Sequence, residues 1–446
     1  MQYEENLKIS VSLAEKIAQR GGRAYYVGGF VRDRLQGLEN KDLDIEVHGI
    51  TPDTLEEILS SMGGYIPAGK SFGVYKLAHH SIDVAMPRKE TLTGKRHRDF
   101  KIDVDPFIGT KKAAIRRDFT VNAIMQDIIT GEIVDHFGGR EDLKNGILRH
   151  VNDTAFGEDP LRVLRGAQFC SRFNFIIAPE TMELCRKIDL TTLSSERVFD
   201  ELKKALLKSD KPSVFFENLR EMNHISFWFP EVEKLVGIPQ HSVHHREGDV
   251  WTHTMMVLDE CAKARDNAEY PLYFMVSGLV HDFGKIICTQ FKKGDYHAYR
   301  HETEGRDIVK TFIRRITNEN SLLSYVLNMT ELHMKPRILF NDNSSVKSTN
   351  KMFDSSSSPN DLILLALCDG KGKIPSKPCR EAEGFLRERL EIFHEYMSRP
   401  YVTGQDLIEA GIKPGKDFSE LLKFAHKLRL SGVSKKEALS QILKIR

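Results

Sequence analysis

The sequence predicts an α+β protein in which a small mixed α/β head precedes a long, almost wholly helical remainder. Between Arg23 and Gly139, short β-rich runs alternate with turns and a few helical stretches; these runs are AYYV, LDIEV, GVYKLA, IDVAM and GEIVDHF. After Gly139, apolar residues recur three and four positions apart in PLRVLRGAQFCSRF, RVFDELKKALL and SVFFENLREM, which is the pattern of amphipathic helices. The same spacing predicts a leading helix over residues 5–19.

Changes in these residue patterns divide the chain of 446 residues into four expected parts. They are a head over residues 1–140, a helical neck and body over 141–236, an all-helical block over 237–400 and a helical tail over 401–446. Within the all-helical block, Ser and Asn cluster without helical periodicity in NDNSSVKSTNKMFDSSSSPND, so we expect residues 341–361 to form a surface loop.

Composition limits the classes of protein that this chain can represent. The 65 Lys and Arg residues against 63 Asp and Glu residues leave a net charge of +2, which neither requires nor excludes a polyanionic partner. No apolar run approaches the roughly 20 residues that span a bilayer, and the first residues do not form a signal peptide. The six cysteines form no CxxC pair. We therefore expect a soluble, cytoplasmic protein with reduced thiols and no membrane partner. The sequence gives no indication of oligomeric state.

A Gly-Gly pair and three aspartates form the first chemical signal. The apolar run YYV leads into Gly28 and Gly29 and then an expected helix, so backbone N–H groups can hold a triphosphate there, although the glycines alone indicate only a tight turn. In KDLDIEV, Asp42 and Asp44 alternate with apolar residues on an expected strand, which points both carboxylates to one face. Asp83, in SIDVAM, is expected to join them from a neighbouring strand as ligand or base. Mg²⁺ would remove their mutual repulsion, activate a ribose hydroxyl and stabilise a pyrophosphate leaving group.

The run GGFVRD followed by KDLDIE resembles the head of the class II tRNA nucleotidyltransferases, a branch of the polymerase-beta-like superfamily. The likeness continues, in the family's order, through IRRDFTVNAI, GEDPLRVLRGAQFCSRF and SSERVFDELKKAL. It implies template-independent addition of CCA to the 3′ end of tRNA from CTP and ATP, with Mg²⁺ as cofactor. The nucleotide contacts that the resemblance implies are Gly28, Gly29, Arg32, Asp33, Arg116, Arg117, Asp118, Asn122, Asp159, Arg162 and Arg165.

The motif EDPLR predicts how the base is chosen. Pro160 suits the first position of a helix, so Asp159 is placed to cap that helix, and Arg162 follows on nearly the same face. An aspartate accepts from the amino group that cytosine and adenine both carry, while an arginine donates to the adjacent ring nitrogen. Uracil and guanine present a keto oxygen and a ring N–H instead. We therefore expect this pair to select C or A without a template, and helix capping is the simpler alternative.

The segment RKETLTGKRHRDFKIDVDPFIG carries a cluster of basic residues, which are Arg88, Lys89, Lys95, Arg96, His97 and Arg98. By itself it is typical of a solvated loop. In the resembled family, a flexible loop at this place helps the switch from C to A addition, and enzymes limited to CC addition lack much of it. The segment is not visibly shortened in this chain, which favours complete CCA synthesis.

A second polar cluster lies in the expected helical block. Histidine and aspartate supply the nitrogen and oxygen ligands that a divalent transition metal such as Mn or Ni accepts. The candidate ligands are His253, His281, Asp282 and Asp369, with His301 and His333 for a second metal or as solvated helix ends. The adjacent pair in HDFGK resembles the HD phosphohydrolase superfamily. Some bacterial CCA-adding enzymes carry such a domain with phosphatase and cyclic-phosphodiesterase activity, so we expect a second, hydrolytic activity.

Three other functions are alternatives to CCA addition. An A-adding or poly(A)-type polymerase would use the same head residues. A signalling phosphohydrolase with a degenerate head is disfavoured by the complete GGFVRD, DLD, RRDF and EDPLR set, and a purely nucleic-acid-binding module would need neither cluster.

The tail DLIEAGIKPGKDFSELL resembles the family's C-terminal element that helps to grip tRNA, but it departs from the usual pattern at Lys416 and Asp417.

Overall fold

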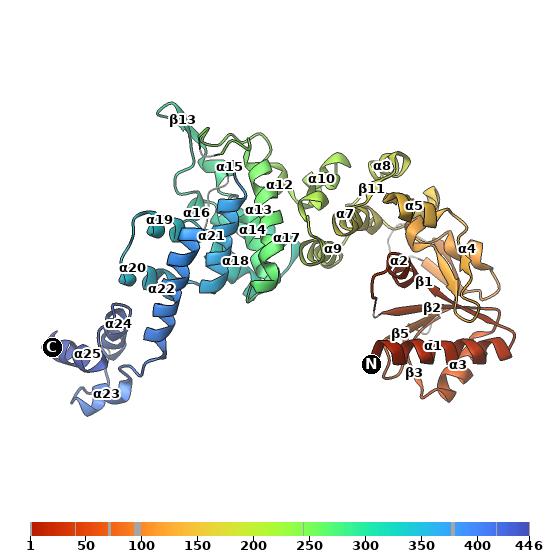
Figure 1. Cartoon of the computed structure of the whole chain (residues 1–446), viewed down its shortest axis with the longest axis horizontal. Coiled ribbons are helices and arrows are strands. Elements are labelled where there is room, and N and C mark those ends of the chain that lie inside the picture. Colours follow the sequence, from red (N-terminus) through yellow and green to blue (C-terminus); the bar gives the residue numbers. More distant parts are fainter. Residues whose placement is uncertain are drawn as a thin grey trace. The chain divides into compact units, whose positions relative to one another are not determined.

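The computed structural model describes residues 2–40, 42–69, 73–92, 100–243, 245–375, 380–415 and 417–445 (Figure 1). The chain forms two compact units. Unit 1 comprises residues 1–201 and 221–224, and unit 2 comprises residues 202–220 and 225–446. The expected α+β fold class is confirmed, whereas the finer division into four parts stays a prediction.

A seven-stranded sheet forms the centre of unit 1, in the order β3-β4-β5-β2-β1-β8-β9. Its strands are β1 (Arg23–Val27), β2 (Leu43–His48), β3 (Tyr65–Gly69), β4 (Val74–Leu77), β5 (Ile82–Ala85), β8 (Met125–Asp127) and β9 (Ile133–Val134). The neighbours pair antiparallel apart from β2 and β5, which run parallel. The β-rich runs predicted β1, β2, β4, β5 and β9, whereas β3 and β8 were not expected.

Alternation along β2 gives the sheet one apolar and one polar face. Leu43, Ile45 and Val47 belong to the main hydrophobic core of the head. Helices α1 (Gln2–Gln19) and α3 (Pro52–Ser61) contribute apolar side chains to the same core, and α1 confirms the predicted leading helix. The intervening residues Asp44 and Glu46 therefore lie on the opposite face, which is where the candidate site is found.

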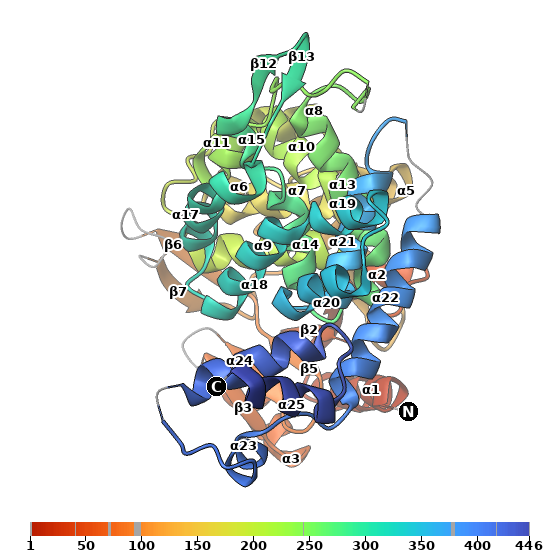
Figure 2. The same cartoon turned by 90° about the vertical axis from the view of Figure 1, so that its left-hand side faces the viewer.

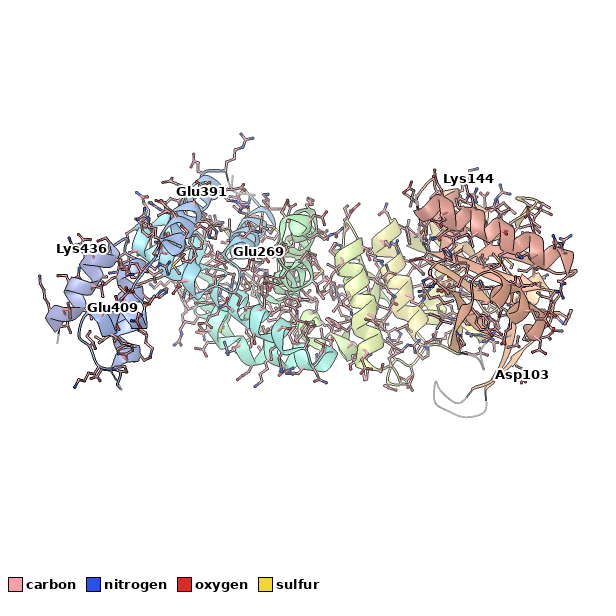
Figure 3. The ribbon with its side chains drawn as sticks, turned by 90° about the horizontal axis from the view of Figure 1, so that it is seen from below. Asp103, Lys144, Glu269, Glu391, Glu409 and Lys436 are labelled. Atoms are coloured by element: carbon pink, nitrogen blue, oxygen red, sulfur yellow. The ribbon has the colours of Figure 1, made fainter. Side chains whose placement is uncertain are left out.

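The rest of unit 1 consists of short helices and two strand pairs. The helices are α2 (Gly29–Leu35), α4 (Thr110–Ala114), α5 (Gly139–Asn145), α6 (Asp153–Gly157), α7 (Leu161–Phe173), α8 (Pro179–Cys185) and α9 (Ser195–Lys208), which crosses the division between the units. The strand pairs are β6 (Arg88–Leu92) with β7 (Phe100–Val104), and β10 (Ile147–Leu148) with β11 (Ile176–Ile177). Figure 3 marks this unit by Asp103 on β7 and Lys144 on α5.

Unit 2 is built almost entirely of helices. They are α10 (Ser213–Glu221), α11 (Ile225–Trp228), α12 (Pro230–Glu233), α13 (Val250–Ala264), α14 (Pro271–Val280), α15 (Lys285–Cys288), α16 (His301–Glu304), α17 (Arg306–Ile316), α18 (Asn320–Leu332), α19 (Lys335–Asn341), α20 (Val346–Ser355), α21 (Pro359–Lys371) and α22 (Arg380–Ser398). Among the described residues, no helix is both long and apolar enough to cross a membrane.

The predicted surface loop over residues 341–361 is wrong, because the segment contains α20 and the start of α21. Ser345 and Ser358 each accept a hydrogen bond from a backbone N–H in the first turn of a helix, at 3.4 and 3.2 Å. The serines are therefore helix caps rather than signs of irregular structure. Met352 and Phe353 on α20 are buried.

A β-hairpin interrupts the block that the sequence predicts as all-helical. Strands β12 (Gln290–Lys292) and β13 (Asp295–His297) pair antiparallel and are joined by Lys293 and Gly294. Both joining residues have positive φ, 55° and 85°, as a tight two-residue hairpin turn requires. In Figure 2 the two strands project beyond the helices of this unit.

Three helices form the end of the chain: α23 (Gly404–Glu409), α24 (Phe418–Arg429) and α25 (Lys435–Ile445). They enclose a small core of their own that includes Leu407, Ala425 and Ile442. In Figure 3, Glu409 and Lys436 mark this tail. The predicted helical tail is confirmed; Lys416, at which it departs from the resembled pattern, lies outside the described residues.

Candidate functional sites

The sheet brings the predicted catalytic aspartates together. Asp44 on β2 is the direct parallel partner of Asp83 on β5. Asp42 immediately precedes β2, which begins at Leu43. Burial raises the pKa of Asp44; the Arg117 charge opposes this shift, and the neighbouring charges of Asp83 and Asp42 add to it. Crowded carboxylates of this kind are the hard oxygen donors that suit Mg²⁺, so the residues fit the expected ion.

Gly28 places bare backbone beside these carboxylates. It is the N-cap of α2 and has φ of 67°, a conformation that glycine adopts without strain. A Cβ atom at this position would lie 3.3 Å from Arg117 Nη1 and 3.5 Å from Asp44 Oδ2. The predicted strand-turn-helix arrangement is thus confirmed, while triphosphate binding by Gly28 and Gly29 stays a prediction.

Five of the predicted nucleotide-binding residues form one hydrogen-bonded network. Arg32 Nη1 donates to Asn122 Oδ1 at 2.7 Å, and Arg32 Nε donates to Asp33 Oδ1 at 2.8 Å. Asn122 Nδ2 donates to Asp118 Oδ1 at 2.9 Å, and Arg165 Nε donates to Asp118 Oδ2 at 2.8 Å. Burial raises the pKa of Asp118, but the Arg165 charge and the bonds to Asn122 and Arg165 outweigh it and leave this pKa lowered. The network links α2, α7 and the segment between α4 and β8.

Arg32 is an interior member of this network. Its side chain is only 4% exposed, and its guanidinium lies 4.2 Å from the ring centroid of Phe173. Such cation–π packing stabilises a buried guanidinium. In this structure Arg32 therefore joins α2 to α7, and its implied contact with a nucleotide stays a prediction.

Glu46 is a residue of the polar face that the sequence analysis missed. Its Oε2 accepts from Arg117 Nη2 at 2.9 Å, and its Oε1 lies 2.9 Å from His48 Nε2. Burial raises the pKa of Glu46, but its contacts with His48 and Arg117 outweigh burial and lower it. The alternation in LDIEVH places Glu46 on the same face as Asp44, and that signal could have found it.

Asp159 and Arg162, the predicted base-selecting residues, each have other partners in this structure. Asp159 Oδ2 accepts from Arg197 Nη2 at 2.9 Å, and Asp159 Oδ1 accepts from the backbone N–H of Leu161 at 3.1 Å. Arg162 donates to the carbonyls of Ala155 and Arg116, each at 2.6 Å. Helix α7 begins at Leu161 with Pro160 as its N-cap and no side-chain cap, so the expectation that Asp159 caps this helix and Pro160 is its first residue is wrong, although Asp159 accepts from the backbone N–H of Leu161. Arg197 lies in the run SSERVFDELKKAL, and its contact with Asp159 was not predicted.

The predicted basic segment falls partly on the β6–β7 hairpin. Arg116 Nη1 donates to the carbonyl of Arg88 at 3.1 Å, which joins this hairpin to the segment after α4. The remaining basic residues of the segment are Lys89, Lys95, Arg96, His97 and Arg98. Lys89 belongs to β6, but its side chain is not among those described, and the other four residues lie outside the described residues.

In unit 2 the six predicted metal ligands converge. His253 lies on α13, Asp369 lies on α21, and His301 begins α16. His281 and His333 are the C-cap residues that directly follow α14 and α18. His281, Asp369 and His253 offer ligand atoms within 4.8 Å of one another, as do Asp282, His301 and His333. Asp282 connects the two triads, since its Oδ1 lies 3.2 Å from His301 Nε2 and its Oδ2 lies 3.2 Å from His281 Nε2.

All four histidines present the same ring nitrogen to the cluster. Their Nδ1 atoms face the main-chain carbonyls of Gly372, Gly278, Ala298 and Thr330 at 3.0, 2.8, 2.8 and 2.6 Å. A hydrogen bond from Nδ1 to a carbonyl leaves Nε2 as the acceptor, which is how metal-ligating histidines are usually oriented. Within the described chain, the buried Nε2 atoms of His253 and His281 make no well-aligned hydrogen bond. The cluster therefore fits a divalent transition metal.

Two lysines and a glutamate support this cluster and were not predicted. Lys285 Nζ lies 2.7 Å from Asp282 Oδ2, and Lys373 Nζ lies 3.1 Å from Asp369 Oδ1. Glu247 Oε1 lies 3.2 Å from His253 Nδ1, so a carboxylate backs one candidate ligand. A cavity of about 170 Å³ opens over the cluster and is lined by both lysines.

The chain resembles known proteins over nearly its whole length. Residues 24–149 match the family described as "Poly A polymerase head domain", and residues 174–235 match "Probable RNA and SrmB- binding site of polymerase A". The multifunctional CCA protein of Actinobacillus pleuropneumoniae serotype 5b is 38% identical over 316 residues, which are 69% of this chain and 74% of that protein. The multifunctional CCA protein of Pasteurella multocida is 33% identical over 408 residues, 88% of this chain and 92% of that protein.

Solved structures show the same fold. A CCA-adding enzyme in apo form II aligns over 99% of this chain and 96% of that chain, with a TM-score of 0.70 and 21% identity. The Thermotoga maritima CCA-adding enzyme complexed with tRNA aligns over 100% of this chain and 98% of that chain, with a TM-score of 0.66 and 20% identity. The sequence identity to these relatives, the shared fold and the assembled head site together show that the chain belongs to the family of class II CCA-adding enzymes, which includes the multifunctional CCA proteins.

Proposed function

We propose that the head adds C, C and A in turn to the 3′ end of tRNA, from CTP and ATP and without a template. The observation that carries this proposal is the pairing of Asp44 with Asp83 beside the bare backbone of Gly28, in a head of this family. Relatives named multifunctional CCA proteins support it, as does the similar fold of the Bacillus stearothermophilus CCA-adding enzyme solved in complex with CTP.

Different residues of the head would bind the metal ion, the triphosphate and the base. Asp42, Asp44 and Asp83 would hold Mg²⁺, which when bound activates the terminal ribose hydroxyl and stabilises the pyrophosphate leaving group. Arg117, held by Glu46 next to Gly28, presents a guanidinium to the oxygens of a triphosphate.

Base choice follows from Asp159 and Arg162 once each is turned to a nucleotide. The carboxylate accepts from the exocyclic amino group of cytosine or adenine, and the guanidinium donates to the adjacent ring nitrogen. In this structure Arg197 and two main-chain carbonyls are the partners of these side chains. We infer that nucleotide binding exchanges these contacts for contacts with the base edge.

One assay separates this function from addition of A alone. The protein is incubated with tRNA that ends before CC and, separately, with tRNA that ends in CC, each with labelled CTP or ATP. Complete CCA addition predicts CTP incorporation into the first substrate and ATP incorporation into the second. Incorporation of ATP into the second substrate only would support an A-adding enzyme, and incorporation into neither would refute the proposed function.

We also propose a second, metal-dependent hydrolysis of phosphoesters at the histidine–aspartate cluster of unit 2. The observation that favours it is the common orientation of four histidines, each with Nδ1 toward a carbonyl and Nε2 toward Asp282 or Asp369. The cluster would hold Mn²⁺, Ni²⁺ or a similar ion, which when bound would lower the pKa of a water nucleophile. Lys285 and Lys373 add positive charge for the phosphoryl oxygens.

Metal binding tests this second proposal apart from activity. Titration of the metal-free full chain with Mn²⁺ or Ni²⁺ in a calorimeter is expected to show binding, with a raised temperature of thermal unfolding. Hydrolysis of p-nitrophenyl phosphate is then expected with these ions and not in excess chelator. Absence of both binding and hydrolysis would refute the proposal.

A further inference from the structure

A second cavity adjoins the one over the histidine–aspartate cluster. The inner cavity of about 170 Å³ is below the roughly 300–1,000 Å³ usual for ligand sites, so it has room for metals and a phosphoryl group but not for a whole nucleotide. The outer cavity of about 570 Å³ is within that range. The residues that line both cavities are Pro239, Gln240, His245 and Tyr296. A ligand with a phosphate in the inner cavity can therefore extend into the outer one.

The outer cavity is walled by two exposed aromatic rings on the β12–β13 hairpin. Phe291 and Tyr296 are direct cross-strand partners, so their side chains lie on the same face. Their ring centroids are 5.1 Å apart at an interplanar angle of 68°, so a base that stacks on one ring meets the other near its edge, and 63% of Phe291 and 36% of Tyr296 is exposed. Packing against the core does not account for exposed rings, whereas stacking on the flat face of a base would.

The hairpin is tied in position on the side that faces the cavities. Both carboxylate oxygens of Asp295 accept from the backbone N–H of Ser242 at 3.2 Å, and Oδ2 also accepts from Ser242 Oγ at 2.7 Å. These bonds, with one from the backbone N–H of Tyr296, lower the pKa of Asp295 to about 2, so the tie persists at neutral pH. Tyr296 follows Asp295 directly and is thereby held at the boundary between the two cavities.

A positive charge stands at the same boundary. Lys285 Nζ lies 2.7 Å from Gln240 Oε1, which borders both cavities, and 2.7 Å from Asp282 Oδ2 in the cluster. A phosphate in the inner cavity would meet this ammonium group. The order along the two cavities is therefore metal ligands, ammonium group and aromatic rings, which matches a nucleotide that carries its phosphate at one end and its base at the other.

We propose that Phe291 and Tyr296 form a stacking surface for the base of a nucleotide whose phosphate is held at the histidine–aspartate cluster. This surface would make the second site selective for nucleotides over phosphoesters that lack a base. This inference rests on the proposed hydrolase function and adds the residues that set its specificity.

The test compares one ligand that has a base with one that lacks it, on the full chain loaded with Mn²⁺. Equilibrium binding and steady-state hydrolysis are measured for adenosine 3′-monophosphate and glycerol 2-phosphate. In Phe291→Ala/Tyr296→Ala, the Kd and KM for the nucleotide are expected to rise about ten- to a hundredfold, because a base loses its stacking partners. The KM for glycerol 2-phosphate and the kcat for both are expected to stay within about twofold.

Two further variants keep the result interpretable. Tyr296→Phe retains an aromatic ring and is expected to bind the nucleotide like the parent, and Phe227→Ala removes an exposed ring that lines neither cavity. Equal losses for both ligands, or unchanged nucleotide binding, would overturn the stacking surface. If the parent binds the nucleotide through these rings but hydrolyses neither ligand, the stacking surface stands and the proposed hydrolase function fails.

Discussion

Arg197 Nη2 donates to both carboxylate oxygens of Asp159, at 3.0 and 2.9 Å, and so occupies the edge that the sequence assigns to a nucleotide base. Arg162, three residues from Asp159, is turned instead to the carbonyls of Ala155 and Arg116. Base selection by this pair therefore needs an exchange of partners. That requirement makes the pair the most informative place to test the head.

Replacing Arg162 by Ala removes the donor to the ring nitrogen, and with it the penalty on a base that carries a ring N–H. A good base contact is worth about 1–3 kcal/mol of discrimination, so the preference for CTP over UTP is expected to fall roughly ten- to a hundredfold. Asp159→Ala is expected to weaken use of CTP and ATP together. The measurement is kcat/KM for all four nucleotides on the matching truncated tRNA. Unchanged selectivity in both folded variants would show that EDPLR does not choose the base.

Asp44→Asn tests the carboxylate cluster. Because burial raises the pKa of Asp44, ionised Asp44 destabilises the folded head above that pKa, and removal of the charge is expected to leave thermal stability unchanged or slightly raised. Addition of both C and A is expected to fall by at least about a hundredfold, since a metal ligand is lost. Hydrolysis at the second cluster is expected to be unaffected. Exposed Asp53→Asn on α3 is the matched control, and an equal loss of both activities in Asp44→Asn would contradict two separate sites.

Glu46→Ala tests whether this carboxylate positions Arg117 for the triphosphate. A hydrogen bond to a charged group contributes about 1.5–3 kcal/mol, so the KM for both CTP and ATP is expected to rise about tenfold or more, with a smaller change in kcat. Glu46→Gln keeps one acceptor and is expected to recover part of the loss. Glu57→Ala, an exposed residue of the same unit, provides the control. A fall in kcat with unchanged KM for both nucleotides would refute the positioning role.

His281→Ala with Asp282→Ala removes two adjacent members of the second cluster. Hydrolysis of adenosine 3′-monophosphate and metal binding by calorimetry are expected to be lost, whereas CCA addition stays within several-fold of the parent. The matched control is His426→Ala with Asp354→Ala, which removes a partly exposed pair at 2.9 Å in the same unit. Parental rates of hydrolysis in the cluster variant would show that the cluster is not the hydrolytic site.

Local pattern alone determined much of the fold and of the candidate sites. Alternation in KDLDIEV and SIDVAM predicted strands that present Asp44 and Asp83, because side chains on a strand point to opposite faces with a period of two. Spacing of three and four residues predicted α7 and α9 for the same kind of reason. The residue types in HDFGK and its neighbours indicated a metal cluster because ligand chemistry is a property of each side chain.

Only the tertiary structure decided which of these residues meet. Glu46 and Arg117 are 71 positions apart and Asp159 and Arg197 are 38 apart, and no periodicity relates such positions. His253 turns Nδ1 to the carbonyl of Gly372, 119 positions away, whereas the other three histidines each use a carbonyl three residues earlier, so helix packing decides the first orientation and brings all four rings together. The caps of α20 and α21 and the turn of the β12–β13 hairpin were missed because Ser, Asn and Gly favour several local structures, and the surrounding packing selects among them.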